Sequence, residues 1–101
     1  MKTTLKPKLS QKAFASVWDA LEDDPVVAAN LAMRSELLRA LDKRVGSWKL
    51  TQAEAARRLD ITQPRLNDLL RGRISKFSLD ALVNLAKRAD IKVELKIRNA
   101  A

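Results

Sequence analysis

The sequence predicts a mainly α-helical protein, a compact bundle of about five helices that ends in one C-terminal β-strand. The chain of 101 residues has the length of about one domain. It contains only two Gly and three Pro, too few for the many turns of an all-β fold. Apolar residues recur at helical spacing along most of the chain, whereas near the C-terminus they alternate with charged residues as in a strand.

The first 24 residues predict a basic arm plus a short amphipathic helix, which precede a domain of residues 25–101. Four Lys and no acidic residue fall within the first twelve positions. The next apolar side chains recur at i, i+3, i+4 and i+7, so they share one face of a helix over about residues 12–22. These side chains are Phe14, Val17, Trp18 and Leu21.

A long helix is expected to begin after Asp23 and Asp24. A carboxylate at this point can accept from free backbone N–H groups, and Pro25 suits the first helical position. Gly46 is expected to end the helix, because Gly readily adopts the left-handed conformation of helix C-termini. The residues expected on the buried face are Val27, Leu31, Leu38, Leu41 and Val45, with Met33 and Leu37 beside them.

Two short helices are predicted next, over Gln52–Leu59 and Gln63–Arg71. Thr51 and Glu54 stand at capping-box spacing, so hydroxyl and carboxylate can each satisfy one free N–H group at the start of the first helix. Thr62 can cap the second helix in the same way.

The connection between these helices is three residues long, which is the span of a helix-turn-helix motif. Asp60 is expected in the left-handed conformation, which Asp tolerates. Ala56 is small enough to lie where the two helices cross. The apolar contact beneath the motif is expected from Leu59, Ile61, Leu66 and Leu69.

One more helix and a strand complete the prediction. Gly72 is expected to end the second short helix, and Ser78 to cap a helix over residues 79–89. Leu79, Leu82, Val83 and Ala86 are expected to face the core.

Residues 91–98 alternate between apolar and charged side chains, which predicts an amphipathic strand. A lone strand leaves its backbone groups unpaired, so the expected neighbour is the same strand of a second copy in a homodimer. Pairing with the sheet of another protein is the alternative. The apolar residues of this predicted dimer contact are Ile91, Val93, Leu95 and Ile97.

Composition restricts the possible functions. A net charge of +8 and a pI near 10.3 favour a polyanionic partner, nucleic acid ahead of an anionic membrane. The excess of basic over acidic residues is largest over residues 43–76, which contain nine basic and three acidic residues. With no Cys and no His, the chain lacks thiol nucleophiles, imidazole bases and the usual zinc ligands, so we expect neither catalysis nor a cofactor. No apolar run suits a membrane span or a signal peptide, so we expect a cytoplasmic protein.

Residues Leu50 to Gly72 resemble the helix-turn-helix of Xre, or Cro-type, regulators; they read LTQAEAARRLDITQPRLNDLLRG. The resemblance covers about residues 26–98, and its later part is similar to small Xre-type proteins that serve as HigA-like antitoxins. It departs at Asp60, where many relatives carry Gly. It implies a sequence-specific DNA-binding transcription regulator and, further, an autorepressing antitoxin whose partner is a RelE-like or HigB-like toxin. The alternatives are a stand-alone Xre-type repressor and a protein-interaction module without DNA binding.

The second helix of the motif is expected to enter the major groove of a pseudopalindromic operator. With Leu66 inward at 100° per residue, the side chains expected to contact bases are Gln63, Pro64, Arg65, Asn67 and Asp68. Asp68 either accepts from a cytosine amino group or holds Arg65 and Arg71 in their rotamers. The basic arm is either a solvated tail or a further DNA contact. The expected phosphate contacts are Thr51, Gln52, Arg57, Arg71, Arg73, Ser75 and Lys76.

An antitoxin also needs a surface for its toxin. The segment of residues 13–24 is acidic, and this charge would suit a basic toxin. Packing within the fold is the alternative role for its aromatic side chains. The candidate residues are Phe14, Trp18, Asp19, Glu22, Asp23 and Asp24.

Overall fold

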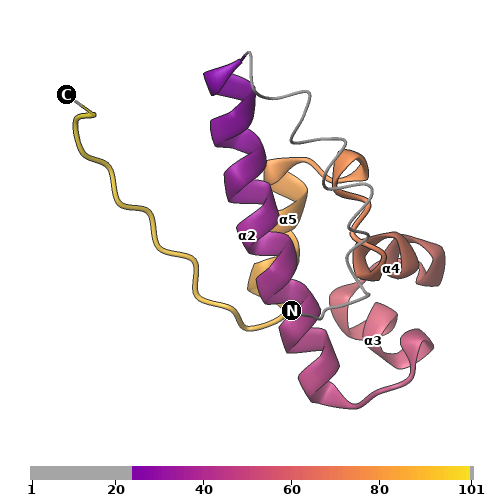
Figure 1. Cartoon of the computed structure of the whole chain (residues 1–101). Helices are drawn as coiled ribbons and strands as arrows, with labels where there is room; N and C mark the ends of the chain where they lie inside the picture. Colours follow the sequence, from indigo (N-terminus) through magenta and orange to yellow (C-terminus); the bar gives the residue numbers. More distant parts are fainter. Residues whose placement is uncertain (1–23, 101) are drawn as a thin grey trace.

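The computed structural model describes residues 24–100, which form four α-helices, one 3-10 helix and no strand (Figure 1). The elements are α2 (Pro25–Trp48), α3 (Gln52–Leu59), α4 (Gln63–Leu70), η1 (Ile74–Lys76) and α5 (Leu79–Arg88). Four of the five predicted helices are therefore present. The predicted basic arm and the helix over residues 12–22 lie outside the described residues.

The start of α2 agrees with the sequence-based expectation. Asp24 Oδ1 accepts hydrogen bonds from the backbone N–H groups of Val26 and Val27, at 3.0 and 3.3 Å. This cap satisfies two of the N–H groups that a helix leaves free at its N-terminus. Most of the predicted face is buried, together with one polar side chain: Leu31, Ser35, Leu38, Leu41 and Val45.

The predicted end of α2 at Gly46 is wrong. The helix continues through Gly46 to Trp48, and Lys49 takes the left-handed conformation instead, with φ 55°. The added residues bring the Trp48 ring against the core, and the Arg58 guanidinium lies 4.1 Å from the ring centroid. Partial burial of the indole and this cation–π contact offset the cost of a glycine within a helix.

The helices α3 and α4 form the predicted helix-turn-helix. Thr51 Oγ1 accepts from the Glu54 N–H at 3.2 Å, and Glu54 Oε1 accepts from the Thr51 N–H at 2.9 Å, so the capping box is complete. Asp60 turns the chain in the left-handed conformation, with φ 57°. The Ile61 N–H then donates to the Ala56 carbonyl at 3.0 Å. Ala56 is buried at the crossing, as its small size predicts.

The core lies where α2 packs on α5 and where α3 and α4 pack beneath the turn (Figure 1). Burial of each large apolar side chain contributes about 1.5–3 kcal/mol to the free energy of unfolding. This core fixes α4 relative to α2. The largest fully buried side chains are Phe77, Leu31, Leu38, Leu41, Leu59, Leu66, Leu69 and Leu82.

Three apolar residues expected in the core remain exposed: 43, 48 and 38% of the surface of Val27, Met33 and Val83 is accessible to solvent. Met33 and Val83 line a groove between α2 and α5, where Leu37 and Leu79 are partly buried. Helical periodicity identifies the face of a helix that meets the core, but the width of the contact depends on how closely the neighbouring helix approaches.

The predicted C-terminal strand is absent from the described residues. Residues 91–100 form an irregular, extended segment after α5, and its first residues still line the groove between α2 and α5 (Figure 1). A strand exists only when it pairs with a neighbour, and no other strand occurs within residues 24–100. Of the predicted dimer contact, Ile91 packs against the core, whereas Val93, Leu95 and Ile97 are 47, 78 and 84% exposed.

None of the helices described is both long and apolar enough to cross a membrane.

Candidate nucleic-acid interface

The outer face of α4 is the centre of the candidate interface. Thr62 Oγ1 accepts from the Arg65 N–H at 3.2 Å and so caps the helix. Leu66 and Leu69 are fully buried, which turns the opposite face of α4 outward. Gln63 and Pro64 are exposed on that face, and Asn67 is partly exposed. These three lie on the outward face, as the helical wheel predicts, and their contact with bases stays a prediction.

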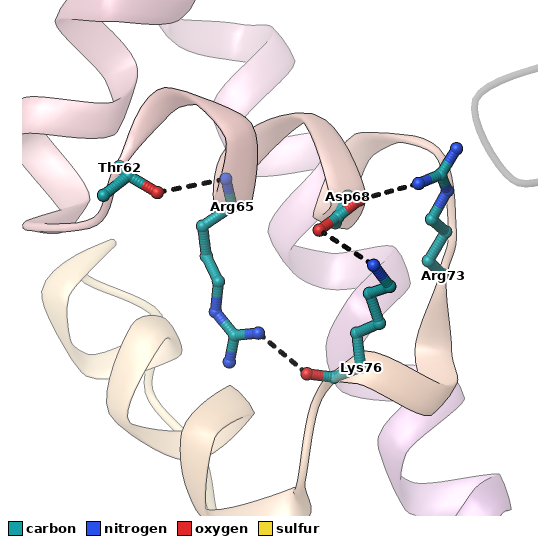
Figure 2. Close-up of polar contacts among 5 residues, drawn as sticks. All are labelled: Thr62, Arg65, Asp68, Arg73 and Lys76. Carbon is teal, nitrogen blue, oxygen red and sulfur yellow. Dashed lines mark hydrogen bonds and ion pairs between the residues drawn. The ribbon is translucent and has the colours of Figure 1, made fainter.

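Arg65, which is also expected to contact bases, turns its guanidinium toward the segment after α4 instead. Its Nη1 donates to the Lys76 carbonyl at 2.8 Å (Figure 2). Its guanidinium carbon lies 4.1 Å from the centroid of the buried Phe77 ring. In this structure Arg65 therefore joins α4 to the segment that follows it.

Asp68 orients neighbouring cations, as one of its two predicted roles requires, but the cations are different ones. One carboxylate oxygen accepts from Arg73 Nη1 at 3.0 Å, and the other lies 3.8 Å from Lys76 Nζ (Figure 2). The expected partners, Arg65 and Arg71, are not involved. The chain reverses at Gly72, which has φ 72°, and this turn brings residues 73–76 back alongside α4.

A residue that the sequence analysis missed, Arg34 of α2, supports the same segment from the other side. Its Nη1 lies 3.3 Å from the Ile74 carbonyl oxygen and 3.2 Å from that of Phe77. Arg34 is three residues after Leu31 and four before Leu38, so a charged side chain stands on a face that is apolar apart from Ser35. That placement is the signal that could have identified it.

Most of the predicted phosphate-binding residues lie on two segments that flank α4 in Figure 1, α3 with its N-cap and residues 73–76, whereas Arg71 is the C-cap of α4 itself. The side chains of Arg73 and Lys76 remain 45 and 54% exposed despite their ion pairs with Asp68. The hydroxyl of Thr51 is occupied by the capping box. The remaining predicted contacts are exposed: Gln52, Arg57, Arg71 and Ser75.

Thr51 also determines the electrostatics at the start of α3. The backbone N–H of Thr51 donates to the Glu54 carboxylate and is the main cause of a lowered Glu54 pKa, to which the Thr51 hydroxyl and the charge of Arg57 add. Glu54 therefore stays charged to lower pH than an ordinary Glu, whose pKa is 4.5. The carboxylate in turn compensates the free N–H groups of the helix.

The predicted toxin surface lies mostly outside the described residues, and the predicted dimer contact lies beside a groove. Of the candidate toxin-binding residues, Asp24 is the N-cap of α2, and the other five lie outside the described residues. The groove beside the C-terminal segment has a volume of about 340 Å³. Its lining includes Met33, Val83, Val93 and Leu95.

Comparison with known proteins agrees with this geometry. The model of a protein family described as a helix-turn-helix domain matches residues 20–98, which is most of the chain. A search of curated proteins found no match. From α2 to the C-terminal segment, the match includes every element described above. The chain therefore belongs to the helix-turn-helix domain family.

Proposed function

We propose that this protein is a sequence-specific DNA-binding regulator of transcription, with α4 as its recognition helix. The observation that carries the proposal is the outward face of α4, whose exposed polar side chains are flanked by exposed cations on two other segments. An α-helix fits the major groove, where base edges differ between the four base pairs. Such a regulator acts in the cytoplasm, where its operator is, and it needs no catalytic group or cofactor.

Base contacts come from the exposed face of α4. The amides of Gln63 and Asn67 can pair with N6 and N7 of adenine, and the Pro64 ring can meet a thymine methyl group. Asp68 can accept from a cytosine amino group only in competition with Arg73 and Lys76. Arg65 can reach a guanine only after it leaves the Lys76 carbonyl.

Phosphate contacts come from either side of α4. Gln52 and Arg57 belong to α3, whereas Arg73, Ser75 and Lys76 belong to the segment after α4. Arg71, exposed at the C-terminal end of α4, completes the set. These contacts position the protein on the duplex without specifying its sequence.

Selection of bound duplexes from a random pool tests the proposal, because the selection itself identifies the operator. Gln63→Ala should relax one base position and cost about 1–3 kcal/mol, whereas Lys76→Ala should weaken all sequences alike and lower the salt slope by about one. Lys43→Ala is the control, because Lys43 of α2 lines a separate pocket with Ile91 that contains none of the proposed DNA contacts. Binding of the operator no tighter than of random duplex at physiological salt would contradict the proposal.

We further propose that the protein binds a pseudopalindromic operator as a homodimer. One recognition helix contacts only a few base pairs, so two-fold symmetry doubles the contact set. The exposed Val93, Leu95 and Ile97 supply an apolar surface, and pairing of two C-terminal segments would satisfy their backbone groups.

The narrower proposal is an autorepressing antitoxin, supported by the resemblance of residues 71–86 and the C-terminal segment to HigA-like proteins and by the acidic segment at residues 13–24. A RelE-like or HigB-like toxin encoded beside this gene should arrest growth, and co-expression of this protein should relieve the arrest. Neutralising substitutions at Asp19, Glu22 and Asp23 should abolish the relief but keep operator binding. Relief that persists would contradict the proposed toxin surface, and a neighbouring gene without toxicity would favour a stand-alone repressor.

A further inference from the structure

We propose that Arg65 and Arg34 are positioning residues, which hold residues 73–77 (the phosphate loop) in one place beside α4. This inference rests on the proposed function and deepens it. It assigns to Arg65 a role other than base contact, and it gives Arg34 a role in DNA recognition although Arg34 belongs to α2.

Arg65 holds the loop from the side of α4. Its guanidinium uses two kinds of contact at once, a 2.8 Å hydrogen bond to the Lys76 carbonyl and stacking on the Phe77 ring at 4.1 Å (Figure 2). A planar guanidinium can do both, whereas a Lys ammonium in its place would lose the stacked plane and the fork. Withdrawal of Arg65 toward a base would break both contacts.

Arg34 holds the loop from the side of α2. Its Nη1 donates to the carbonyls of Ile74 and Phe77, and its Nε donates to Asn30 Oδ1 at 2.7 Å, which fixes the direction of the guanidinium. These carbonyls come from either end of the 3-10 turn. Arg34 therefore holds the main chain of the turn, and these hydrogen bonds do not depend on which side chains the loop carries.

The loop held in this way carries the cations that suit phosphate contacts. Ile74 and Phe77 are buried and anchor its apolar side, with 3 and 1% exposure. Asp68 of α4 meanwhile orients Arg73 and Lys76 on the exposed side. Base contacts from α4 and phosphate contacts from the loop thus share one rigid frame, and recognition requires that frame to keep its geometry within fractions of an ångström.

Charge-conserving variants of the full-length chain test the inference. Arg65→Lys and Arg34→Lys should each lower affinity for the selected operator by about tenfold, the cost of one charge-assisted hydrogen bond. Affinity for random duplex should fall less, because both variants keep the charge that drives non-specific binding, and the order of base preference at every operator position should stay unchanged. Arg44→Lys is the matched control, because Arg44 also donates to a main-chain carbonyl, that of Asp90 at 2.9 Å, but away from the loop.

Two results would overturn the inference. If Arg65→Lys relaxes one base position while Arg34→Lys does not, Arg65 contacts a base. If both variants keep full operator affinity and differ from the parent only in thermal stability, the two arginines have a structural role alone.

Hydrogen exchange of the free protein separates this inference from the proposed function. The Lys76 and Phe77 amides donate within the loop, to Arg73 and Ile74 carbonyls at 3.0 and 3.1 Å. Both amides should exchange faster in Arg65→Lys and Arg34→Lys, and their exchange should not change in Arg44→Lys. The Ala55 amide of α3 should exchange at the same rate in all three variants. If the Lys76 and Phe77 amides exchange at the parent's rate in Arg65→Lys and Arg34→Lys, the inference is wrong even if DNA binding is specific. Faster exchange in a protein without sequence preference would instead refute the proposed function, and with it the role of the loop on DNA.

Discussion

The arginines of this chain divide into those that hydrogen-bond main-chain carbonyls of the fold and those that are exposed and can meet phosphate. Four arginines each donate to a main-chain carbonyl 11 to 46 residues away in the sequence: Arg34, Arg44, Arg65 and Arg88. The guanidinium group suits this task because it offers several donors in a fixed plane. The net charge of +8 therefore overstates the charge that is free to meet phosphate. The salt dependence of DNA binding should accordingly reflect the exposed cations around α4 rather than the whole chain.

Two glycines in opposite backbone conformations predict opposite effects of the same substitution. Gly46 lies inside α2 and is exposed, so Gly46→Ala should raise the free energy of unfolding by about 0.5–1 kcal/mol. Gly72 has φ 72°, where a Cβ atom is unfavourable, so Gly72→Ala should lower it by about 1 kcal/mol or more. Urea unfolding measures both values. A destabilised Gly46→Ala protein would mean that another surface approaches α2 at this glycine.

Ser35 is a polar residue in an apolar setting. Its side chain lies on the core face of α2 with 2% exposure, and its Oγ has no hydrogen-bond partner among the described residues. Ser35→Ala removes an unsatisfied hydroxyl and improves helix propensity, so it should stabilise the fold by about 1 kcal/mol. Thermal unfolding of this variant beside Ser47→Ala, whose hydroxyl donates to the Arg44 carbonyl, provides the comparison. A lower melting temperature for Ser35→Ala would indicate that the hydroxyl has a partner.

At the scale of elements, the capping box of α3 makes stability depend on pH. The folded-state pKa of Glu54 is below its ordinary value of 4.5, so its contribution is complete above that value and is lost as the pH falls through the folded pKa. Glu54→Gln should therefore weaken the fold at neutral pH and reduce the loss of stability on acidification. Thr51→Ala, which removes the reciprocal cap, should cost about 1 kcal/mol at neutral pH. Unfolding curves at neutral and acidic pH test this, and parallel pH profiles for the parent and Glu54→Gln would rule it out.

The ends of most elements were predictable because local chemistry decides them. Asp24, Thr51, Thr62 and Ser78 cap their helices as the sequence predicts. The end of α2 was not predictable, because partial burial of Trp48 depends on the helices that arrive later in the chain. The prediction of a C-terminal strand was wrong for a related reason. Alternation of apolar and charged residues shows that a segment could pair in a sheet, but not whether a neighbouring strand is present.

The candidate site follows the same division between local and distant effects. The outward face of α4 could be predicted from the inward placement of Leu66 and Leu69. The orientation of Arg65 could not, because it depends on Phe77 and the Lys76 carbonyl, which reach α4 only after the turn at Gly72. A helical wheel contains no information about such partners.

At the scale of the whole molecule, the helix-turn-helix and the C-terminal segment lie on different sides of α2 (Figure 1). The surface proposed for DNA and the surface proposed for a second copy are therefore separate. A dimer formed through the C-terminal segments leaves both recognition helices open. Two half-sites about one helical turn apart are the spacing that such a dimer would bind.

Deletion of Lys92–Ala101 tests the dimer and keeps the residue that the core needs. Ile91 packs against the core and its N–H donates to the Ala86 carbonyl at 2.9 Å, so the deletion begins after it. The shortened chain should sediment as a folded monomer that binds half-sites weakly, because the loss of symmetry removes half of the contacts. The paired substitution Val93→Ser with Leu95→Ser should give the same monomer, since both side chains are exposed in the single chain.

The control for that substitution lies on the same segment. Lys92→Ser with Lys96→Ser changes the alternate positions, which face away from the proposed contact, so the dimer and its operator affinity should persist apart from a smaller salt dependence. If the deletion leaves both the sedimenting mass and the operator affinity unchanged, the two copies do not meet through this segment. If only the lysine variant dissociates, charge rather than apolar burial holds the copies together, and the apolar residues 93, 95 and 97 must then serve a different partner.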